Sequence, residues 1–68
     1  MKEIITALEA GKILQINGQA VREHIKRKIP PFDTGGYVIE GKRNQYLVYT
    51  RKMLEAFGIP VEEAERRL

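Results

Sequence analysis

The segment INGQAVREHIKRKIPP, residues 16–31, carries the strongest structural pattern in the chain. Asn17 is a favourable N-cap and a glycine follows it, so a turn leading into a helix over residues 18–28 is expected. Val21 and Ile25 lie four residues apart and form the buried stripe of that helix. The proline pair ends the helix, because the residue before a proline avoids the α conformation.

The opposite face of this helix is polar and mostly cationic. Its residues are Gln19, Arg22, Glu23, Lys26 and Arg27, with Lys28 directly after them. The three consecutive cations occupy the expected last turn, where positive charge suits the helix dipole. The helix therefore presents one apolar side to a core and one basic side to solvent.

Upstream, apolar residues recur at spacings of three to four and predict a helix: Ile4, Ile5, Leu8, Ile13 and Leu14. Gly11 interrupts this pattern at a cost of about 1 kcal/mol relative to alanine. The helix therefore either ends there, leaving residues 12–16 as a strand, or runs on to Leu14. The alternation in KILQI leaves both arrangements open.

Downstream, residues 32–36 are expected to form a loop. Residues 37–40 and 45–50 are rich in β-branched and aromatic side chains and predict a hairpin. Thr50 is placed to cap a helix that ends at Gly58, and a final short helix begins at the following proline. These elements indicate an α+β domain, with helices packed on an antiparallel sheet of two strands, or of three if residues 12–16 join it.

The chain has 68 residues, which predicts a single domain over residues 1–68. It contains no cysteine, so no disulfide framework or thiolate metal site is expected. The N-terminus has no apolar run typical of a signal peptide, and no stretch approaches the roughly 20 apolar residues of a membrane span. These features predict a soluble, cytoplasmic protein without a membrane partner.

The net charge is +3 at pH 7, and its distribution is uneven. Residues 12–52 hold nine Lys or Arg against three acidic residues, a net charge of +6. The segments on either side are mildly acidic, with net charges of −1 and −2. A small domain with a basic centre favours nucleic acid as a partner.

Catalytic chemistry finds little support in the sequence. The chain has no Cys, no Ser and a single histidine, His24, which lies beside an apolar stripe. Nucleophilic catalysis needs an activated nucleophile with a base in reach. The adjacent Glu62 and Glu63 fit a solvated helix face better than an acid–base pair, and no residues have metal-ligand spacing. We therefore expect no enzymatic activity, no catalytic residues, no metal and no cofactor.

Cations on the helix over residues 18–28 and at the hairpin tip, Lys42 and Arg43, suggest a helix in a DNA groove with a wing on the adjacent backbone. Gln19 and Arg22 near the helix start have side chains that pair with adenine and guanine. Phosphate contacts would add affinity that weakens with salt.

Several stretches of the chain carry a family pattern. Residues 5–16, ITALEAGKILQI, match it at Ile5, Thr6, Glu9, Ala10, Ile13, Leu14 and Ile16. The aliphatic spacing continues through Val21 and Ile25, and Pro31 follows six residues after Ile25. Residues 36–49, GYVIEGKRNQYLVY, have the composition of a two-stranded wing. Residues 54–57, LEAF, close the pattern. Over residues 5–57 the chain resembles excisionase and MerR-type winged helix-turn-helix domains.

The resemblance implies a small winged-helix-like domain that binds double-stranded DNA as an accessory or regulatory factor. In that arrangement the helix over residues 18–28 enters the major groove and the hairpin over residues 37–49 is the wing. The residues expected to face bases or phosphates are Gln19, Arg22, Glu23 and Lys26, and those expected on phosphates are Arg27, Lys28, Lys42 and Arg43.

The alternative is a homodimeric protein-interaction module of a phage or mobile element, with no nucleic-acid binding. The hairpin strands are apolar enough to form an interface with a second copy or a protein partner. The residues that favour this alternative are Tyr37, Val38, Ile39, Leu47 and Val48.

Overall fold

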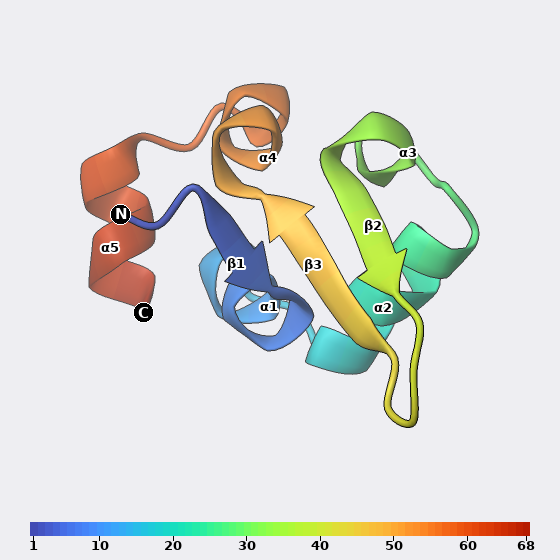
Figure 1. The fold of residues 1–68 in the computed structure, drawn as a ribbon. Helices are drawn as coiled ribbons and strands as arrows, with labels where there is room; N and C mark the ends of the chain where they lie inside the picture. The colour runs from blue at the N-terminus through green and yellow to red at the C-terminus, as the bar shows by residue number, and fades with distance from the viewer.

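The computed structural model describes all 68 residues as one sheet with helices around it (Figure 1). The elements in chain order are β1 (Ile4–Thr6), α1 (Ala7–Leu14), α2 (Gly18–Lys26), α3 (Phe32–Gly35), β2 (Gly36–Ile39), β3 (Gln45–Tyr49), α4 (Thr50–Phe57) and α5 (Val61–Arg67). The three strands are antiparallel in the order β1-β3-β2. The expected α+β, winged-helix-like architecture is confirmed, with a sheet of three strands.

The helix α1 continues through Gly11 to Leu14, so the alternative of a strand over residues 12–16 is wrong. Gln15 then adopts a left-handed conformation with φ 61° and ends the helix. Asn17 caps α2 as expected, because its Oδ1 accepts a hydrogen bond of 2.7 Å from the backbone nitrogen of Gln19. The two helices and the short turn between them form a helix-turn-helix.

The third strand comes instead from the first residues of the expected N-terminal helix. Residues 4–6 form β1, in which Ile5 pairs with Val48 of β3. Ile5 is buried, whereas Leu8, which the helical pattern placed on the apolar stripe, is 58% exposed. The expectation of a helix from Ile4 is wrong because pairing with β3 outweighs the local periodicity.

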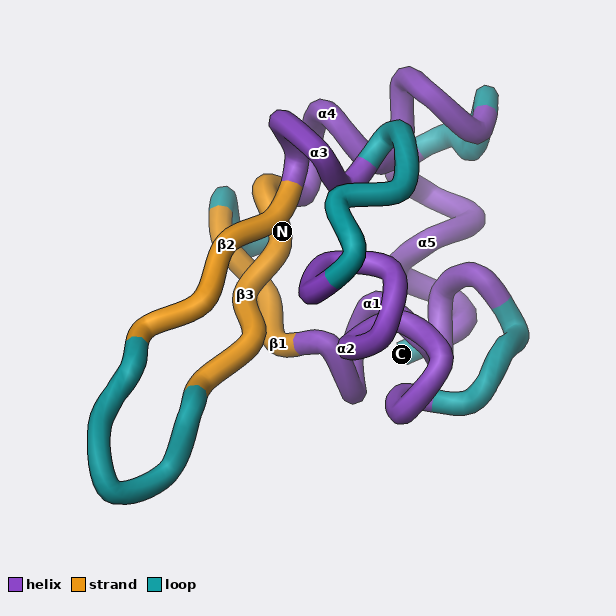
Figure 2. Tube along the Cα trace, turned by 90° about the vertical axis from the view of Figure 1, so that its right-hand side faces the viewer, coloured by secondary structure: helices purple, strands orange, loops and turns teal.

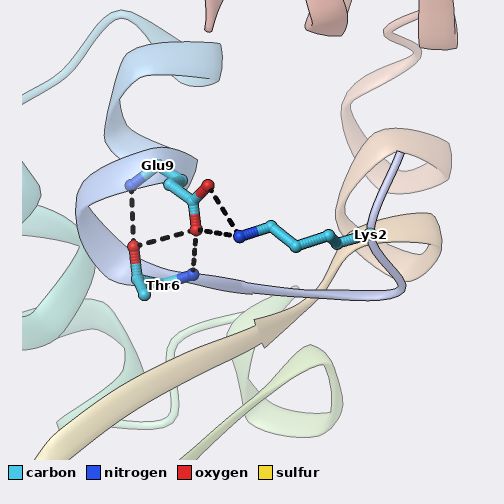
Figure 3. Close-up of polar contacts among 3 residues, drawn as sticks. All are labelled: Lys2, Thr6 and Glu9. Carbon is cyan, nitrogen blue, oxygen red and sulfur yellow. Dashed lines mark hydrogen bonds and ion pairs between the residues drawn. The ribbon is translucent and has the colours of Figure 1, made fainter.

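A capping box marks the point where β1 becomes α1 (Figure 3). The backbone nitrogen of Glu9 donates to the Thr6 hydroxyl at 3.2 Å, and the Thr6 backbone nitrogen donates to the Glu9 carboxylate at 3.1 Å. Lys2 forms an ion pair of 3.2 Å with the same carboxylate. Because a capping box satisfies backbone donors that a helix leaves free, it stops the helix from extending toward Ile4.

The sheet has one covered face and one open face. The side chains of Ile5 and Val48 belong to the buried core, and Val38 and Tyr46 pack against it. An added Cβ on Gly36 would lie 2.9 Å from Cγ1 of Ile25, so α2 lies directly against β2. Figure 2 shows the helices on one side of the strands, to their right, and no helix on the other side.

Two details of the second half differ from expectation. Residues 32–35 form the short helix α3 and not a loop, because Phe32 is buried in the core. Thr50 is the first residue of α4 and not its cap, which is Tyr49, and its backbone nitrogen donates to the carbonyl of Glu3 at 2.9 Å. Gly58 ends α4 in a left-handed conformation, as expected.

The C-terminal helix α5 closes the core on the side of α1. Ala64 is fully buried, and Arg67 donates from Nη1 to the carbonyl of Ile13 at 2.6 Å. The guanidinium thereby satisfies a carbonyl at the end of α1 that the helix itself leaves free. No helix in the domain combines the length and apolar character that crossing a lipid bilayer requires.

Candidate nucleic-acid interface

The helix α2 presents a continuous polar stripe on the side opposite to its buried residues. Gly18, Val21 and Ile25 are buried, while Gln19 and Lys26 are exposed and Arg22 is partly exposed. Nε of Arg22 donates to Oε1 of Gln19 at 3.2 Å. Residues 19, 22 and 26 are spaced by three and four, so they share one face of the helix.

The C-terminal end of α2 concentrates cations. Arg27 is the C-cap and forms a 3.6 Å ion pair with Glu23, one turn earlier. The helix ends at Lys26 and not at residue 28 as expected, because Lys28 has φ 55°, a left-handed conformation that turns the chain away from the helix axis before the prolines are reached. Lys26, Arg27 and Lys28 are all exposed, so of the predicted residues at this end only Arg27 has an acidic partner.

The loop between β2 and β3 protrudes beyond the rest of the domain (Figures 1 and 2). Lys42 and Arg43 lie at its tip, are exposed and form no ion pair. The backbone nitrogen of Gly41 donates to Oδ1 of Asn44 at 3.4 Å across the loop. The hairpin therefore carries two free cations away from the core, as a wing would.

A groove separates the C-terminal end of α2 from the hairpin. Lys26 and Lys28 line one side, and Asn44 lies on the hairpin side. Asp33 and Glu40 line the same groove and balance its two lysines. The groove as a whole therefore carries no net charge, and the predicted cations outside it that form no ion pair are Arg22 on α2 and Lys42 and Arg43 at the hairpin tip.

The side chain of His24 packs beside the core residue Phe32. Its ring is half-buried and lies 5.9 Å from the ring of Phe32, measured between centroids. Nowhere do three His, Asp or Glu side chains gather closely enough to hold a metal ion.

The structure separates the apolar hairpin residues into two sets. Val38 packs against the core and Val48 is part of it, so neither is available to a partner. Tyr37, Ile39 and Leu47 lie on the open face of the sheet, because side chains alternate along a strand. The interface expected from five apolar residues thus retains only three of them.

Further cations lie outside the predicted set. Lys12 is exposed on α1, and Arg51 and Lys52 are exposed at the start of α4. Lys52 lies over the ring of Tyr49, with Nζ 5.4 Å from its centroid. These residues belong to the basic segment 12–52, but no local pattern assigns them a position.

Comparison of the chain with models of protein families, with curated proteins and with solved structures finds no match.

Proposed function

We propose that the chain is a non-enzymatic, cytoplasmic DNA-binding protein of an accessory or regulatory kind. The helix α2 enters the major groove and the β2–β3 hairpin lies on the adjacent backbone as a wing. The observation that carries the proposal is the exposed stripe of Gln19, Arg22 and Lys26 on the second helix of a helix-turn-helix. In this motif the second helix is the one that reads base edges.

The dimensions of α2 suit this role. It has nine residues, which at about 1.5 Å per residue span about 13 Å. The major groove of B-DNA is about 12 Å wide, which matches the diameter of a helix with its side chains, about 10–12 Å, so α2 fits within it. Gln19 and Arg22 lie toward the N-terminal end, where side chains of a recognition helix contact bases, and Lys26 and Arg27 lie toward the C-terminal end and meet phosphates.

The resemblance to excisionase and MerR-type domains agrees with this assignment. Those families often place glycine before the wing, where this chain has Lys28. Lys28 has a left-handed backbone, which is the conformation that glycine adopts without strain. The position thus retains the family's backbone requirement while adding a cation beside the end of α2.

The test is duplex binding measured by fluorescence anisotropy with a mixed-sequence duplex at low salt. We expect binding that weakens steeply as salt increases, because phosphate contacts release counterions. The double variant Arg22→Ala/Lys26→Ala removes two cations from the stripe and should abolish duplex binding. The control Arg51→Ala/Arg66→Ala removes the same charge from α4 and α5 and should retain most of the affinity. Absence of binding by the unmodified chain at low salt would refute the proposal.

The competing candidate is the homodimeric interaction module of a phage or mobile element. It is favoured by the exposed apolar residues of the open sheet face, of which Ile39 is 49% exposed. It predicts a dimer at micromolar concentration in sedimentation, together with no affinity for duplex DNA. A monomer under these conditions would exclude it.

A further inference from the structure

The open face of the sheet is apolar, aromatic and uncharged. The outward-facing strand positions are Ile4, Thr6, Tyr37, Ile39, Gln45, Leu47 and Tyr49, as the register of the three strands places them. Ile4 is 41% exposed and Tyr49 is 39% exposed. Figure 1 looks onto this face and shows no element covering it. A contiguous exposed apolar surface is a candidate binding site for a partner.

Two tyrosines lie together at one end of this face. The rings of Tyr37 on β2 and Tyr49 on β3 have centroids 5.2 Å apart and are tilted by 36°. Lys52 places its ammonium group 5.4 Å from the centroid of Tyr49. An aromatic surface beside a cation is the combination that binds a nucleobase by stacking and its phosphate by charge.

The charges around the face select its partner. The free cations Lys42 and Arg43 lie beyond one end of the strands, and Lys52 lies at the other. The carboxylate of Glu9, which contacts Thr6, is already paired with Lys2. The strand positions of the face carry no acidic group, so a second copy would find acidic partners for its cations only at the margin, where Glu3 and Glu55 line the same cleft as Tyr49 and Lys52. A polyanion with apolar bases complements both the face and its surroundings.

We propose that this open face binds single-stranded DNA, with a base stacked on the exposed ring of Tyr49 beside Tyr37 and with Lys52 on a phosphate. The aliphatic neighbours Ile39 and Leu47 suit the methyl group of thymine, which favours DNA over RNA. Three strands about 4.8 Å apart leave room for about two stacked bases. The cations of the hairpin tip extend the contact along the strand.

This site goes beyond the proposed function and shares only the cations of the hairpin tip with it. The recognition stripe lies on α2, behind the sheet, and the tyrosine pair lies on the opposite face. A duplex meets the first site and a single strand the second. Either activity can therefore fail while the other remains.

The experiment measures fluorescence anisotropy of a labelled thymidine oligomer of about ten nucleotides, a length within the range that single-strand sites occupy. An abasic strand of the same length retains the phosphates and removes the bases. Stacking predicts at least about tenfold weaker binding of the abasic strand. Equal binding of the two strands would overturn the proposal, as would the absence of binding to the thymidine oligomer.

The variants separate stacking from charge. Tyr49→Leu keeps an apolar side chain but removes the ring, and should weaken binding about tenfold. Tyr49→Phe keeps the ring and should retain the affinity. Arg22→Ala/Lys26→Ala should lose duplex binding but retain its affinity for the thymidine oligomer. This result distinguishes failure of this proposal from failure of the duplex site.

Two further outcomes decide against the proposal. Unchanged affinity of Tyr49→Leu, with a far-ultraviolet circular dichroism spectrum equal to that of the unmodified chain, would place the single strand elsewhere. Tighter binding of a uridine RNA oligomer would assign the face to RNA. A dimer in sedimentation that Tyr49→Leu dissociates would assign it to a second copy.

Discussion

Gly11 of α1 lies directly against Gly18 of α2. A Cβ added at Gly11 would lie 3.1 Å from the backbone nitrogen of Gly18, 3.2 Å from its Cα and 2.8 Å from the carbonyl oxygen of Ile16. All three atoms belong to the backbone, so none can turn aside. The glycine that interrupts the helical pattern of α1 is therefore what allows the second helix to pack this closely.

Gly11→Ala should destabilise the domain although alanine favours helices. Helix propensity alone would stabilise it by about 1 kcal/mol. The contact with the Ile16 carbonyl should outweigh this and lower the free energy of unfolding by about 1–3 kcal/mol, the range for overpacked sites. Urea denaturation measures the change. Gly41→Ala is the control, since the nearest atom to its added Cβ is 3.9 Å away; a Gly11→Ala variant as stable as this control would contradict the packing argument.

Thr6→Ala should remove the capping box at the start of α1. The Thr6 hydroxyl accepts from the backbone nitrogen of Glu9 at 3.2 Å, and loss of such a cap costs about 1 kcal/mol. Thr6→Ser keeps the hydroxyl and should retain most of the stability. Thermal unfolding followed by circular dichroism compares the two variants, and equal melting temperatures would show that the cap is dispensable.

Stability should also fall at acidic pH through Glu9. The hydrogen bond from the Thr6 backbone holds the pKa of Glu9 below its ordinary value, and Lys2 acts in the same direction against the desolvation that burial causes. Because the pKa is lower in the folded chain than in the unfolded one, the contribution is complete above the unfolded value and is lost as the pH falls through the folded value.

Denaturant unfolding of the unmodified chain and of Glu9→Gln between pH 7 and pH 2 tests this. Glutamine keeps the capping geometry but does not titrate. The stability difference between the two proteins should shrink as the pH falls below the ordinary glutamate pKa and through the lower pKa of Glu9 in the folded chain. A difference that is constant over the whole range would assign the acid sensitivity to other groups.

Arg67→Ala should loosen α5 from α1. The hydrogen bond from Arg67 to the Ile13 carbonyl involves a charged donor, and such bonds contribute about 1.5–3 kcal/mol. Arg66 has an exposed side chain that pairs only with Glu63, so Arg66→Ala should change stability by less than about 0.5 kcal/mol. Melting temperatures of the two variants measure the difference; equal losses would mean that the contact with Ile13 contributes nothing.

Lys42→Ala/Arg43→Ala should weaken duplex binding to a similar extent for all sequences. The two side chains are at the exposed hairpin tip and are assigned to phosphates. Each lost phosphate contact reduces the slope of log affinity against log salt by about 0.9, so the pair should reduce it by about 1.8. Anisotropy titrations at several salt concentrations provide the slope. An unchanged slope would mean that the hairpin does not touch the duplex.

The local pattern of the chain was enough to predict the elements whose causes are local. Asn17 caps α2, Val21 and Ile25 form its buried side, and Gly58 ends α4, all as expected. The hairpin followed from its β-branched strands and polar turn. The exposure of the predicted cations on α2 and at the hairpin tip also agrees with the sequence, because helical periodicity and turn composition decide exposure there.

Other features depended on partners far along the chain. Ile4 and Ile5 have helical spacing, yet they join a strand because β3 offers them a pairing that local periodicity does not contain. Gly11 is a poor helix residue on its own, and only the approach of Gly18 explains its place within α1.

The sequence alone thus determined that the middle segment is basic and that its hairpin strands are apolar. Which of its side chains meet was decided by the tertiary structure. Strand pairing directs the side chains of Val38 and Val48 toward the core, and it leaves the ring of Tyr37 beside that of Tyr49 on the open face. The physical reason is the alternation of side chains along a strand: the register of the three strands chooses the face, and that register exists only once distant segments have packed together.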